Sequence, residues 1–133
     1  MVAQHHIQTA GDILTQVCHG RSKAAGWWTN RIGDDQTKQH VMEAENLVPT
    51  KLCLIHSEIS EGLEGYRKDL NDDHLPHRKM LEVELADAVI RIFDLAGALQ
   101  YDLGGAISEK LEYNSQRADH KPENRAKAGG KKI

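Results

Sequence analysis

Two pairs of acidic residues are the part of this sequence best suited to chemistry. Glu58 and Glu61 are three residues apart, and Glu84 and Asp87 repeat that spacing later in the chain. Residues three apart on a helix share one face and lie one turn above the other. Two neighbouring antiparallel helices would therefore bring four carboxylates together. Such a group repels itself unless a cation neutralises it, and hard divalent cations prefer oxygen ligands.

The residue types narrow the choice of metal. Carboxylates without cysteine or histidine favour Mg²⁺, with Mn²⁺ as a possible substitute, over Zn²⁺. A di-iron bundle requires Glu-x-x-His on paired helices, and no histidine in this chain has a glutamate three residues before it. From the residues alone, an ordinary solvated acidic surface remains the alternative to a metal site.

The acids lie in a stretch that predicts a helical hairpin. Apolar residues recur at helical spacing from Val48 to about Lys68, and again from about Arg78 to Asp102. The segment 71–77 contains the turn residues. A turn this short makes the two helices antiparallel neighbours.

The rest of the chain predicts smaller helical elements. Helical spacing extends over about 4–24 and 106–118, the segment 26–46 is polar and irregular, and Gly104 and Gly105 are expected to end the long helix before them. We expect an all-α fold of the four-helix-bundle type, in which an antiparallel helical hairpin forms the core and oligomerisation completes it. One domain is expected over 1–119, followed by a basic, flexible tail over 120–133.

Composition excludes several classes of protein. The chain has 133 residues, 39% hydrophobic and 5% aromatic, with a net charge of -3. This balance suits a small globular domain and gives no general basic field for nucleic acid. No apolar run reaches the roughly 20 residues that cross a bilayer. Cys18 and Cys53 form no CxxC motif, so free thiols and a cytoplasmic location are expected.

The two tryptophans are adjacent, at Trp27 and Trp28, just after the first predicted helix. One interpretation is that a tryptophan covers a small core. The other is that one ring stacks on a flat ligand such as a nucleobase. The sequence leaves both open.

At these residues the chain resembles a known family. Glu58-x-x-Glu61, 22 intervening residues and Glu84-x-x-Asp87 resemble the ExxE…ExxD signature of MazG-like nucleoside triphosphate pyrophosphohydrolases, of the all-α NTP pyrophosphatase superfamily. Downstream, the run 110–117 is similar to the Lys-x-x-x-Asn-x-x-Arg element that follows the metal helices in many members. The resemblance covers roughly 49–125.

The resemblance implies an enzyme that hydrolyses (deoxy)nucleoside triphosphates to monophosphate and pyrophosphate, in nucleotide-pool housecleaning. It implies that the four acids hold Mg²⁺, which neutralises the phosphates and acidifies a bound water. Glu61 or Glu58 would orient that water or take its proton. The residues expected to bind substrate are Lys110, Asn114, Arg117, Trp27 and Trp28.

The resemblance also implies a homodimer or homotetramer, because related proteins pair their helical hairpins. Two other functions stay open at this point. One is a non-catalytic helical module that binds nucleotides or a protein partner, and the other is a structural oligomer with solvated acids. The enzyme hypothesis accounts for the four acids together with Lys110, Asn114 and Arg117.

Overall fold

The computed structural model describes residues 2–28 and 37–130, which contain helices and no strand. An isolated bridge pairs Asn71 with Lys79. The predicted all-α class is therefore confirmed. The elements are α1 (Val2–Ala24), α3 (Lys38–Glu43), α4 (Leu47–Arg67), α5 (Met80–Ala98), α6 (Leu103–Gln116), a 3-10 turn (Ala118–His120) and α7 (Pro122–Arg125).

The chain divides into two compact units. One runs from Ile13 to Tyr101, and the other joins the residues up to Asp12 to those from Asp102 onwards. The first contains the hairpin, and the second contains α6 and α7. The predicted domain over 1–119 and flexible tail over 120–133 stay predictions, although α7 places a short helix within that tail.

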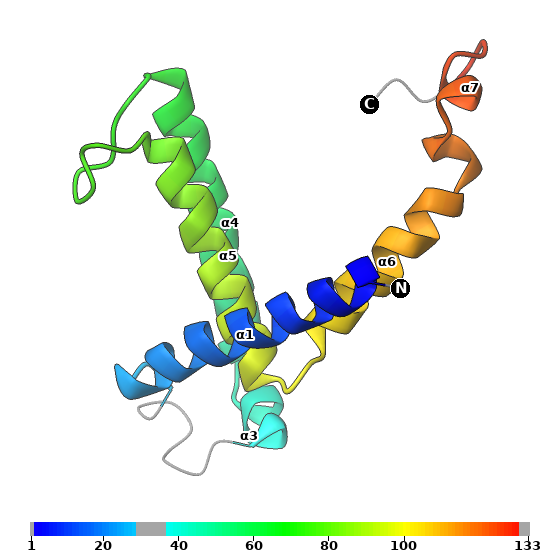
Figure 1. Cartoon of the computed structure of the whole chain (residues 1–133). Helices are drawn as coiled ribbons and strands as arrows, with labels where there is room; N and C mark the ends of the chain where they lie inside the picture. The colour runs from blue at the N-terminus through cyan, green and yellow to red at the C-terminus, as the bar shows by residue number, and fades with distance from the viewer. Residues whose placement is uncertain (1, 29–36, 131–133) are drawn as a thin grey trace. The chain divides into compact units, whose positions relative to one another are not determined.

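The predicted hairpin forms from α4 and α5, which run side by side as the two green helices of Figure 1. Asp72 shapes the connecting turn, because its Oδ1 accepts hydrogen bonds from the backbone N–H groups of His74 and Leu75 at 3.0 and 2.6 Å. A glycine lets the helices approach. A Cβ atom at Gly65 would lie 2.8 Å from the Cβ of Met80, closer than side chains pack.

Two element boundaries differ from the prediction. The long helix ends at Ala98 rather than near Asp102, because Gln100 adopts a left-handed conformation (φ 55°). Gly104 and Gly105 do not end that helix. They lie in the first turn of α6, where Asp102 caps the helix by accepting a hydrogen bond from the Gly105 N–H at 2.8 Å.

The segment 26–46, expected to be irregular, contains the short helix α3. Thr37 caps it by accepting a hydrogen bond from the His40 N–H at 3.2 Å. Its Val41 is fully buried, so the helix supplies one residue to the core. Residues 29–36 of this segment lie outside the described range.

The core of the larger unit lies where α5 ends and α4 begins. It consists of Trp28, Val41, Leu47, Leu95, Ala98 and Leu99. The hairpin is less well covered elsewhere. Its exposed apolar side chains include Leu52, Ile59, Leu63, Tyr66, Leu85 and Val89. No described helix is long and apolar enough to cross a membrane.

Candidate metal centre

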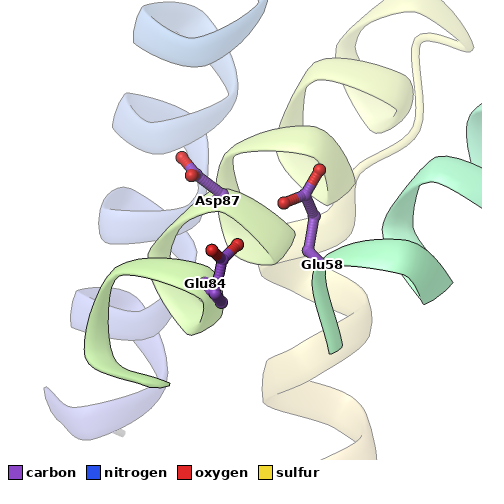
Figure 2. A group of neighbouring side chains, drawn as sticks. All are labelled: Glu58, Glu84 and Asp87. Carbon is purple, nitrogen blue, oxygen red and sulfur yellow. The ribbon is translucent and has the colours of Figure 1, made fainter. Parts of the chain in front are cut away.

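Three of the four predicted acids converge in the hairpin. Glu58 comes from α4, and Glu84 and Asp87 come from α5. Each offers a carboxylate oxygen, and these oxygens all lie within 4.8 Å of one another. Figure 2 shows Glu58 on a segment of α4 beside Glu84 and Asp87 on α5. The antiparallel hairpin therefore unites acids 26 residues apart in the chain, from Glu58 to Glu84.

The site is largely shielded from water. Glu58 and Glu84 are buried, with exposed fractions of 6% and 7%, and Asp87 is half-buried. Gly62 contributes to this close packing, since a Cβ at that position would lie 3.3 Å from the Cβ of Glu84. Buried carboxylates require a counter-charge or a proton.

Arg91 supplies one positive charge. It lies one turn after Asp87 on α5, and its Nε–H donates to Glu58 Oε1 across the hairpin at 2.5 Å. Arg91 is not among the site residues predicted from the sequence. Its spacing from Asp87 on the helix was a usable signal, because residues four apart are neighbours.

The crowding of the three carboxylates favours the protonated form of Glu84. Burial, a hydrogen bond to Glu58 and the nearby charges of Glu61, Glu58 and Asp87 raise the pKa of Glu84 from 4.5 to about 7. Burial and the charge of Glu58 also raise the pKa of Asp87, while Arg91 opposes that change. Three converging carboxylates, of which Glu84 and Asp87 have raised pKa values, fit a hard divalent cation, because the cation would replace the proton.

This pKa predicts how the stability of the metal-free protein depends on pH. An unfolded glutamate titrates near 4.5, so between that pH and about 7 only the folded state holds the proton on Glu84. Raising the pH through this window removes the proton and destabilises the fold. We therefore expect the Glu84→Gln variant to melt at a higher temperature than the wild type at pH 8, and at nearly the same temperature at pH 4.5.

The check is thermal unfolding in a chelator at both pH values. Adding Mg²⁺ at pH 8 should raise the melting temperature of the wild type more than that of Glu84→Gln, because binding to the folded state stabilises it. An equal difference in melting temperature at the two pH values would contradict the assignment of the raised pKa to Glu84.

Glu61, the fourth predicted ligand, is exposed and lies outside the group of three. The negative charge of Glu61 nevertheless acts on the site, because it contributes to the raised pKa of Glu84. Glu61 forms no hydrogen bond or ion pair with the other described residues. Its predicted roles as ligand and as base stay predictions.

The three predicted phosphate-binding residues lie on or at the end of α6, in the other unit. The Lys110 Nζ lies 4.5 Å from the centre of the Tyr113 ring. Arg117 pairs with both carboxylate oxygens of Asp119, at 2.9 and 2.6 Å. Asn114 Oδ1 is buried and accepts no hydrogen bond from the described residues. Their part in the site stays a prediction.

The two tryptophans have opposite environments. Trp27 is 70% exposed, whereas Trp28 is 1% exposed and belongs to the core. The expectation that one tryptophan covers a small core is therefore met by Trp28. Between the two, Trp27 is the ring accessible to a ligand, and the predicted stacking role of either tryptophan is untested.

A buried polar cluster around Asp94 was absent from the sequence predictions. The Asp94 carboxylate accepts hydrogen bonds from His19 Nδ1, Ser22 Oγ and Trp28 Nε1, each at 2.8 Å. Lys51 adds its Nζ at 3.9 Å from Asp94 Oδ2 and 4.2 Å from the centre of the Trp28 ring. An acid within the apolar run 92–96 was the available signal. The cluster ties the end of α1 to α5 and α4.

Comparisons with protein-family models, curated proteins and solved structures gave no match for this chain. What is established is an all-α protein in which the carboxylates of Glu58, Glu84 and Asp87 lie close enough together to hold a metal ion.

Proposed function

We propose that this protein is a Mg²⁺-dependent nucleoside triphosphate pyrophosphohydrolase, similar to the MazG-like enzymes. The observation that carries the proposal is the convergence of Glu58, Glu84 and Asp87 from both acid pairs into one buried group. A solvated acidic surface would not need to bury two of its three carboxylates. The family resemblance, which rests on these same residues, supplies the reaction.

The three acids would hold the cation, which fits their hard oxygen donors. A bound Mg²⁺ would neutralise phosphate charge and lower the pKa of a water ligand. In the proposed reaction, the water oxygen bonds to the α-phosphorus as the α–β anhydride bond breaks. The products are a nucleoside monophosphate and pyrophosphate, with little covalent chemistry required of the protein.

Glu61 is our candidate for the base that takes the proton from this water. It is exposed and has no partner among the described residues, so its carboxylate is free to accept a hydrogen bond. Glu58 is less suited, because Arg91 already occupies its Oε1. Lys110, Asn114 and Arg117 would bind the phosphate groups, and Trp27 would stack on the base.

A homodimer or homotetramer is part of the proposal. An apolar groove of about 360 Å³ runs along the hairpin next to Glu58, and its lining residues are Glu58, Ile59, Gly62, Leu63, Tyr66, Leu81 and Leu85. Pairing of hairpins would remove this groove and the exposed apolar side chains from water. Sedimentation should then give a mass of two or four chains.

The decisive experiment is a panel of ribo- and deoxyribonucleoside triphosphates incubated with protein and Mg²⁺ in ¹⁸O-labelled water. We expect monophosphate and pyrophosphate, with the label in the monophosphate because water attacks the α-phosphorus. Diphosphate with orthophosphate would contradict the proposed reaction. Saturable nucleotide binding without any product would instead favour a non-catalytic nucleotide-binding module.

A further inference from the structure

The ion pair between Arg91 and Glu58 joins a partly exposed side chain to a buried one. Its side chain is 42% exposed, whereas that of Glu58 is 8% exposed. The guanidinium therefore reaches the buried carboxylate from the solvent side, while the backbone of α5 fixes its origin one turn from Asp87. Because Arg91 is fixed at its backbone by α5 and bonded to Glu58 at its guanidinium, it restricts the rotation of the Glu58 carboxylate.

The atoms involved leave the site open to a cation. The Arg91 Nε–H occupies Oε1 of Glu58, and a carboxylate has a second oxygen with its own lone pairs. A carboxylate oxygen of Glu58 also lies within 4.8 Å of oxygens of Glu84 and Asp87. Metal-ligating carboxylates are commonly oriented by a hydrogen bond to the oxygen that the metal does not need.

We propose that Arg91 is a positioning residue for the metal centre, which holds Glu58 through Oε1 so that Oε2 serves as the metal ligand. This inference rests on the proposed metal-dependent function. The opposite role for Arg91 is a competing counter-charge that the cation must displace. The two roles predict opposite changes in metal affinity, because losing a positioning residue weakens binding and losing a nearby positive charge strengthens it.

The test is a Mn²⁺ titration followed by electron paramagnetic resonance, without nucleotide, at pH 8. We expect Arg91→Met to weaken Mn²⁺ binding by about tenfold, as is typical when an outer-shell partner is lost. Arg91→Gln should recover part of that affinity, since its amide can donate to Glu58. Unchanged or tighter binding in both variants would overturn the positioning role.

Arg67→Met is the matched control. Arg67 lies on α4 in an exposed ion pair with Glu64 at 3.5 Å, so the variant removes the same charge without touching the buried acids. Its Mn²⁺ affinity should equal that of the wild type. Should Arg91→Met unfold, which circular dichroism would reveal, the comparison of Arg91→Gln with the wild type decides the inference.

The outcomes separate the two proposals. A wild-type protein that binds no Mn²⁺ would overturn the metal-dependent function and this inference with it. Wild-type binding with unaffected Arg91 variants would overturn the role of Arg91 alone. Mn²⁺ binding that depends on Arg91, in a protein that turns over no nucleotide, would leave the positioning role standing without the reaction.

Discussion

Replacing Asp87 with asparagine is expected to reduce Mg²⁺-dependent nucleotide hydrolysis by at least about a thousandfold, or about 4 kcal/mol of transition-state stabilisation. Asparagine preserves the volume of the side chain and removes the charge that the cation requires. Burial and the charge of Glu58 already disfavour the ionised form of Asp87. The neutral variant should therefore fold at least as well as the wild type.

The measurement combines turnover with the melting temperature in a chelator. Asp73→Asn provides the matched control, because Asp73 is an exposed acid in the hairpin turn and lies outside the metal centre. We expect its turnover to stay within about twofold of the wild type, as for a surface substitution. An Asp87→Asn variant with full activity would show that the reaction does not use these acids.

The largest effect on stability is expected at Asp94. Replacing it with alanine removes the acceptor of three hydrogen bonds, from His19, Ser22 and Trp28, in a buried position. Buried donors without an acceptor are costly, so we expect the free energy of unfolding to fall by about 3 kcal/mol. Urea unfolding followed by circular dichroism would measure this change.

Glu82→Ala is the control for this prediction. Glu82 lies on the same helix and forms an exposed ion pair with Arg78, which contributes little to stability. The variant should unfold within about 0.5 kcal/mol of the wild type. If Asp94→Ala is as stable as this control, the cluster around Asp94 does not hold α1 to the hairpin.

The hairpin and its acid group were predictable because both follow from local rules. Helical spacing defined α4 and α5, and the turn between them required them to be antiparallel. The shared spacing of the two acid pairs then placed their carboxylates near one another. Three of the four converge, whereas Glu61 is exposed and lies outside the group. Which acids meet depends on side-chain packing between the two helices, and the spacing of the acids along the chain does not determine that packing.

The rest depended on contacts between distant parts of the chain. The end of α5 is set by a left-handed Gln100, a conformation that glutamine seldom adopts and that no sequence rule assigns to it. Arg91 could have paired with Asp87 on its own helix, but the register between α4 and α5 gives it Glu58. Likewise, α3 forms around a Thr37 cap and one buried valine, which is too weak a pattern to recognise.

The contrast between Trp27 and Trp28 has a spectroscopic consequence. Adjacent indoles that differ this much in exposure should emit at different wavelengths, with Trp28 shifted to the blue by its burial and Trp27 quenched first by iodide. Trp28 donates to Asp94 beside the core, so its emission reports on the integrity of the larger unit. Trp27 reports on whatever binds at the surface. Two neighbouring residues thus provide separate optical signals for folding and for ligand binding.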